Sequence, residues 1–169
     1  MIRRAVYEDI PVIIPIFERA RRFMERSGNP HQWIDDYPSE TIIAHDIQGR
    51  NFYVEEFNGR LTGCFAFIVG EEPTYQNIEG RWPNELSYGT IHRLASSFEV
   101  TGVASRCFHF CGRLIPNLRA DTHEDNKPMQ HLLLTHGFRY CGRIRVANGS
   151  ERLAYQLTPE VPVSPIILH

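Results

Sequence analysis

His92 is the residue best suited to acid–base chemistry. It lies in the run Tyr-Gly-Thr-Ile-His-Arg-Leu-Ala, where strand alternation puts it on the same face as Tyr88 and Thr90. An imidazole with a pKa of about 6.5 accepts a proton near neutral pH, so His92 is a candidate general base. The alternatives are a histidine packed within the sheet, or a carboxylate base from the set Glu85, Glu124 and Asp125.

A glycine-bearing turn follows this strand-like run. Its sequence is Glu-Val-Thr-Gly-Val-Ala over residues 99–104, and a helical pattern with Ser105 and Arg106 comes next. The N–H groups at a helix N-terminus bind phosphate, and glycine allows the phosphate to approach the backbone closely. The run therefore indicates either a phosphate site or an ordinary turn between a strand and a helix.

The four cysteines do not suggest metal binding. They lie at positions 64, 107, 111 and 141 with no CxxC pair. On a helix, His109 would point away from the face shared by Cys107 and Cys111. We therefore expect reduced thiols and no metal site.

The elements that must position these residues alternate along the chain. Strands are expected at 2–6, 51–57, 60–69, 88–95, 117–122, 138–146 and 151–157, and helices at 10–26, 40–47, 102–114 and 127–136. Asn58-Gly59 and Asn148-Gly149 predict two hairpins, Ser39 predicts a helix N-cap, and Gly137 a helix end. This order predicts an α/β (α+β mixed sheet) class: one mixed sheet of about seven strands with helices on both faces. A single domain over 1–157 and a Pro-rich tail over 158–169 complete the expected organisation.

The chain resembles the GNAT superfamily of acyl-CoA-dependent N-acetyltransferases. The resemblance covers the element order of residues 1–157 and three motifs, YGTIHRLASS, EVTGVAS and NKPMQHLLLTHGF. It implies a GNAT-like fold, acetyl-CoA as co-substrate without a metal, and direct transfer of the acetyl group to an amine.

The resemblance also assigns roles to residues. His92 resembles the general base of arylalkylamine N-acetyltransferases, and Leu133 stands where a tyrosine often protonates the leaving thiolate, so Tyr140 or Ser105 would replace it. Coenzyme A would be held by residues of the strand end, the glycine turn and the start of the last helix: Leu94, Ala95, Ser96, Gly102, Val103, Ala104, Ser105, Arg106 and Asn126. Backbone N–H groups around residues 94–96 would meet the developing oxyanion.

The acceptor side is expected in the loop after the first helix and in the long loop 70–87. Trp33, Tyr37, Tyr75 and Trp82 offer aromatic walls there. Acidic residues of both loops could attract a cationic amine: Asp35, Asp36, Glu71, Glu72, Glu79 and Glu85. The alternative is a solvated acidic loop with aromatic side chains lying on the surface.

Composition and net charge limit the classes of partner that we expect this protein to bind. The 169 residues carry a net charge of −2 with no basic stripe, which argues against binding to nucleic acid. The N-terminal run lacks the apolar segment of a secretory signal, and no apolar run is long enough for a membrane span, so we expect a cytoplasmic protein. The expected partner is a small-molecule amine, and a homodimer through a sheet edge or the apolar tail 166–168 stays open. The alternative function, favoured by Glu99 and Leu133, is a catalytically degenerate protein that binds acyl-CoA or a metabolite.

Overall fold

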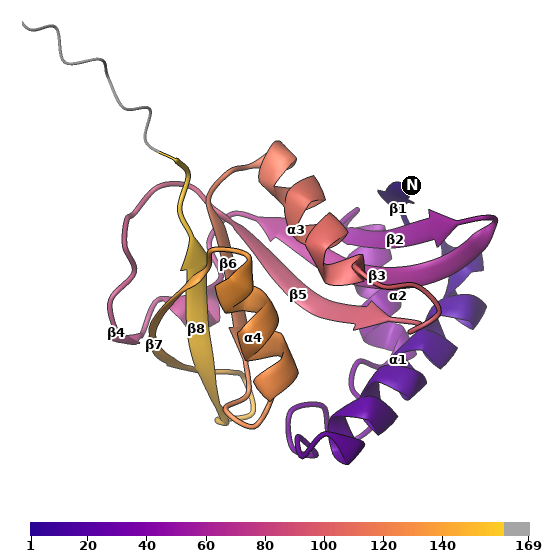
Figure 1. The fold of residues 1–169 in the computed structure, drawn as a ribbon, viewed down its shortest axis with the longest axis horizontal. Helices are drawn as coiled ribbons and strands as arrows, with labels where there is room; N and C mark the ends of the chain where they lie inside the picture. The colour runs from indigo at the N-terminus through magenta and orange to yellow at the C-terminus, as the bar shows by residue number, and fades with distance from the viewer. Residues whose placement is uncertain (161–169) are drawn as a thin grey trace, which may run out of the picture.

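A mixed sheet of eight strands organises residues 1–160, the part of the chain that the computed structural model describes (Figure 1). The strands are β1 (Ile2–Arg4), β2 (Phe52–Phe57), β3 (Arg60–Val69), β4 (Glu79–Gly80), β5 (Gly89–Ser96), β6 (Leu118–Thr122), β7 (Arg139–Arg145) and β8 (Glu151–Leu157). They lie in the order β1-β2-β3-β5-β6-β8-β7-β4, and only β5 and β6 pair in parallel. Of the predicted tail 158–169, residues 161–169 lie outside the described part.

Helices cover both faces of the sheet (Figure 1). Helices α1 (Ile10–Arg26) and α2 (Glu40–Gln48) bury Ile13, Phe17 and Ile43 against β2 and β3. On the other face, α3 (Val103–Leu114) and α4 (Lys127–Thr135) bury Phe108 and Leu133. The predicted fold class, a mixed sheet with helices on both faces, is confirmed. The eighth strand arises because β4, within the predicted loop 70–87, pairs with β7.

The local signals in the sequence define the ends of several elements. Asn58 and Gly59 both have positive φ, as the tight turn between β2 and β3 requires. Gly149 also has a positive φ, in the turn between β7 and β8. The hydroxyl of Ser39 accepts a hydrogen bond from the N–H of Ile42 and so caps α2. Gly137, with φ of 88°, follows α4. Both predicted hairpins and both predicted helix ends are therefore confirmed.

The sheet opens in its middle, between β5 and β6. Their parallel register covers only Gly89–Ile91 against Leu118–Ala120. On its other side β5 pairs with β3, where Ala66 faces His92 but Cys64 faces Ala95, so β5 carries one extra residue at Arg93 and Leu94. Arg93 has φ of 54°, which marks a β-bulge. A bulge bends its strand, and the bend leads the C-terminal half of β5 away from β6.

Candidate active site

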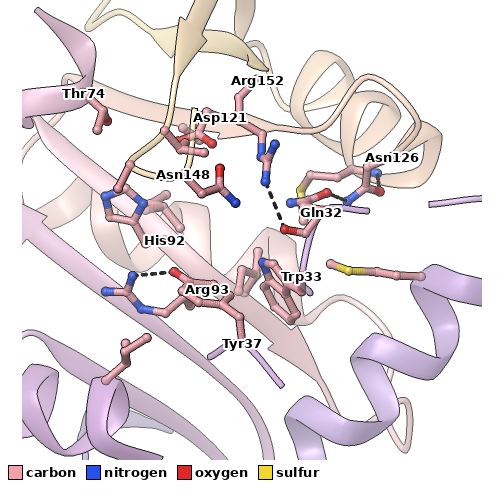
Figure 2. A pocket seen from close by; sticks show the side chains of 18 of the residues that line it. Gln32, Trp33, Tyr37, Thr74, His92, Arg93, Asp121, Asn126, Asn148 and Arg152 are labelled. Carbon is pink, nitrogen blue, oxygen red and sulfur yellow. Dashed lines mark hydrogen bonds between the residues drawn. The ribbon is translucent and has the colours of Figure 1, made fainter. Parts of the chain in front are cut away.

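The cavity between the parted strands brings together residues that are distant in the sequence (Figure 2). It measures about 650 Å³. Its walls come from the α1–α2 loop, β5, β6, α4 and the β7–β8 turn, with lining residues that include Gln32, Trp33, Tyr37, His92, Asp121, Asn126, Asn148 and Arg152. Phe108 of α3 and Leu133 of α4 also line it, so the cavity reaches both faces of the sheet.

His92 and Glu72 form a hydrogen-bonded pair at this cavity. The Nε2 atom of His92 lies 3.2 Å from Oε2 of Glu72, and both side chains are mostly buried. The other carboxylate oxygen of Glu72 accepts from the hydroxyl of Thr74 at 2.9 Å and from its N–H. With Nε2 donating to a carboxylate, the lone pair of His92 is on Nδ1, for which the described residues supply no hydrogen bond. The pair is therefore an imidazole with an orienting carboxylate.

The same contact holds Glu72 in its ionised form. The hydrogen bond from His92 lowers the pKa of Glu72 to about 2, against desolvation, which raises it. A carboxylate whose folded pKa is depressed adds stability above its unfolded pKa and loses that contribution as the pH falls. Glu72 therefore stays negatively charged at neutral pH, next to Nε2 of His92.

This pKa shift predicts a pH-dependent stability difference. Glu72→Gln should be less stable than the wild type, by an amount that is full above about pH 4.5 and shrinks as the pH falls towards 2. Urea unfolding of both proteins between pH 3 and 7 measures the difference, with Glu71→Gln as an exposed neighbouring control. A difference that stays constant across this range would contradict the ionic role of Glu72.

Asp121 is another carboxylate of the cavity, which Asp35 of the α1–α2 loop also lines. It follows Ala120 at the point where β6 leaves β5, and its Oδ2 accepts from the hydroxyl of Tyr75 at 2.7 Å. Burial, with added repulsion from Asp121, raises the pKa of Tyr75 well above its usual value, so Tyr75 stays a neutral donor. Tyr75 therefore supports Asp121 from within the core.

Gln32 connects the α1–α2 loop by hydrogen bonds to Asn126, at the start of α4, and to Arg152 of β8 (Figure 2). Its side-chain oxygen accepts from Nδ2 of Asn126 at 2.8 Å, and its backbone oxygen accepts from Nη2 of Arg152 at 3.0 Å. The other end of the Asn126 amide caps α4 by accepting from the N–H of Met129. Both polar atoms of Asn126 are thus already engaged.

The N-terminus of α3 presents free backbone donors. Gly102 has φ of 81° and precedes α3 without a side-chain cap. The first hydrogen bond of the helix runs from Arg106 N–H to the Gly102 carbonyl, so the N–H groups of Val103, Ala104 and Ser105 have no helical partner. Such groups form an anion site.

Both cations beside this turn are paired. The guanidinium of Arg106 donates to Oε1 of the buried Glu55, at 2.7 Å from Nη2, and to the backbone oxygen of Thr101. Arg19 lies 3.4 Å from Glu99. The charged side chains at the turn are therefore engaged, and the backbone N–H groups of α3 remain as donors.

Of the other predicted residues, Trp33 and Leu94 line the cavity, whereas Ala95 and Ser96 do not. Trp33 lines the cavity and packs edge-on against Phe17, and Leu94 lines it at the bulge. Ala95 and Ser96 stay paired with β3.

Three of the residues predicted for catalysis or for the acceptor lie outside the cavity lining. Trp82 packs on Arg119, whose guanidinium lies 4.0 Å from the indole and 3.9 Å from the ring of Tyr88, and it does not line this cavity. Tyr75 is buried and reaches the cavity only through Asp121. Tyr140 is 53% exposed and packs against Tyr155, next to a β-bulge where β7 carries Cys141 as an extra residue against β8. The structure therefore does not bring Tyr140 to His92.

The described residues contain no group of three or more His, Cys, Asp or Glu arranged to hold a metal ion. Within residues 1–160 no helix is both long enough and apolar enough to span a bilayer.

Solved structures with this architecture identify the family. An acetyltransferase of the GNAT family from Streptococcus agalactiae is 34% identical, with 95% of this chain and 96% of that chain covered and a TM-score of 0.86. A GNAT-family acetyltransferase from Listeria monocytogenes is 20% identical over 92% of each chain, with a TM-score of 0.68. A Salmonella typhimurium protein solved with its cofactor acetyl-CoA is 18% identical, covers 99% and 98%, and has a TM-score of 0.60. No protein-family model and no curated protein matches the sequence. The chain belongs to the GNAT family of acetyltransferases.

Proposed function

We propose that this protein transfers an acetyl group from acetyl-CoA to the amine of a small-molecule or amino-acid-like acceptor by direct attack. The observation that carries the proposal is the cavity through the opened sheet, with Phe108 and Leu133 at one end and the His92–Glu72 pair on its wall. A thioester entering from the α3–α4 side would meet an amine entering from the α1–α2 loop. Proteins of similar structure include the ribosomal-protein-S18-alanine N-acetyltransferase from Escherichia coli, so the acceptor must be argued from this cavity.

The cofactor side would depend on the backbone. The pyrophosphate would accept from the free N–H groups at 103–105, where Gly102 leaves room for its approach. Val103 packs on Gly63, where a Cβ would lie 2.4 Å from its methyl group, so the position of α3 is fixed on the sheet. Arg106 holds the turn through Glu55 and Thr101. Asn126 would act by capping α4, since both ends of its amide are engaged.

The chemical step assigns His92 as the base. Nδ1 of His92 would take a proton from the acceptor's ammonium group, directly or through a water, while Glu72 stabilises the imidazolium that forms. The amine nitrogen then attacks the thioester carbonyl, the C–S bond breaks, and the second nitrogen proton goes to the departing thiolate. N–H groups at the bulge near Leu94, outside the β3 register, would stabilise the oxyanion.

Binding and turnover test the proposal together. Isothermal titration should show saturable binding of acetyl-CoA, and an amine panel should release free thiol above the rate of hydrolysis. Absence of acetyl-CoA binding would overturn the proposal. Binding with no turnover on any amine would instead favour the non-catalytic acyl-CoA-binding alternative, which the buried apolar Leu133 at the usual tyrosine position suggested.

A further inference from the structure

Arg152 is a buried cation that faces the cavity. It lies near the start of β8, its residue is only 6% exposed, and its guanidinium points towards the α1–α2 loop (Figure 2). It donates to three neutral oxygens: the hydroxyl of Ser150, the backbone oxygen of Glu151 and that of Gln32. These contacts orient the guanidinium without neutralising it.

Other buried arginines of the protein have their charge compensated. Arg93, also at the cavity, lies 2.7 Å from the buried Asp46. Arg119 lies between the faces of Trp82 and Tyr88. Within residues 1–160, Arg152 has neither a carboxylate within ion-pair distance nor an aromatic face. Burial lowers the pKa of Arg152, and the more distant Asp121 only partly opposes that effect.

We infer that Arg152 binds a carboxylate of the acceptor, so that the acceptor is a small amine that also carries a carboxylate. The inference rests on the proposed function. A guanidinium whose remaining donors face a cavity matches the two oxygens of a carboxylate, and burial makes an uncompensated charge costly until such a group arrives.

The charges around Arg152 give the acceptor an orientation. Asp121 and the Glu72–His92 pair place negative charge and a proton acceptor on one part of the wall, where an ammonium group belongs. Arg152 places positive charge near the start of β8, and all four side chains line the same cavity. Figure 2 labels His92, Asp121 and Arg152 among them. An amino acid carries both charges within a few bonds, whereas the N-terminus of a protein has no free carboxylate beside its amine.

Matched acceptors test the inference. Each L-amino acid would be compared with its carboxamide and with the amine that lacks the carboxyl group, together with ω-amino acids, at saturating acetyl-CoA. For its best acceptor the wild type should prefer the acid over the amide by about 30-fold in kcat/KM, the size expected for hydrogen bonds to a charged group. Arg152→Gln should abolish this preference mainly through KM, and Arg152→Lys should retain part of it. Arg145→Gln, an exposed arginine on β7, should keep the full preference.

A binding measurement gives a second readout. In the presence of CoA, the preferred acid should raise the melting temperature of the wild type and not that of Arg152→Gln. Equal kcat/KM for acids and amides in the wild type, or an unchanged preference in Arg152→Gln, would overturn the role of Arg152. Turnover of amides and simple amines would leave the acetyltransferase proposal standing in that case, whereas loss of acetyl-CoA binding would remove both.

Discussion

Replacing His92 with alanine is expected to lower kcat for acetyl transfer by about 100- to 1,000-fold. A positioned general base contributes a factor of this size, and the described residues place His92 at the cavity with its Nε2 held by Glu72. Acetyl-CoA affinity should not change, because His92 lies on the β5 strand and not at the α3 N-terminus.

The pH dependence distinguishes a lost base from a distorted site. Without His92, the variant depends on acceptor molecules that are already deprotonated in solution. Its kcat/KM should therefore rise tenfold per pH unit up to the pKa of the acceptor amine. Rates measured from pH 6 to 9 check this, with His109→Ala on the exposed face of α3 as control. A rate for His92→Ala within threefold of the wild type would remove His92 from the mechanism.

Substituting Gly102 with alanine should weaken acetyl-CoA binding by about 100-fold. Gly102 has φ of 81°, and an added Cβ would lie 2.9 Å from Nη1 of Arg106, beside the N–H groups proposed to hold the pyrophosphate. Losing two hydrogen bonds to a charged group, each worth about 1.5 kcal/mol, gives an effect of this size.

Gly59→Ala is the matched control for this substitution. Gly59 also has a positive φ, of 74°, but a Cβ there meets nothing within 4 Å. Both variants should lose about 1 kcal/mol of unfolding free energy from backbone strain, measured by urea denaturation. Only Gly102→Ala should lose affinity in isothermal titration. Equal affinities in the two variants would show that the turn at Gly102 does not contact the cofactor.

Local sequence signals were enough to predict the fold. The Asn-Gly pairs, the Ser39 cap and the alternation around His92 each act over a few residues, and the structure has the corresponding turn, cap or strand. The bulge at Arg93 could not be read in the same way. A positive φ at an arginine has no local signature, because it follows from the mismatch of β5 with β3.

The candidate site was predicted less completely, because its partners come from distant segments. Glu72 was one of six acidic loop residues, and its pairing with His92 across 20 positions depends on how loop 70–87 folds back. Arg152 belonged to an unremarkable strand, and only its burial beside Gln32 distinguishes it. Trp82 and Tyr140 were assigned by residue type alone, and packing against Arg119 and Tyr155 decided their positions instead.

The paired cations beside the α3 N-terminus also bear on how fast an anionic cofactor would arrive. The charge of Arg106 is balanced by Glu55 at 2.7 Å, and that of Arg19 by Glu99 at 3.4 Å. Each pair therefore produces little electric field beyond the Debye length of about 8 Å. Electrostatic steering speeds association only where unpaired charge of one sign gathers. These two cations would therefore add little to the rate at which the anionic cofactor arrives, and the backbone amides would act only after contact.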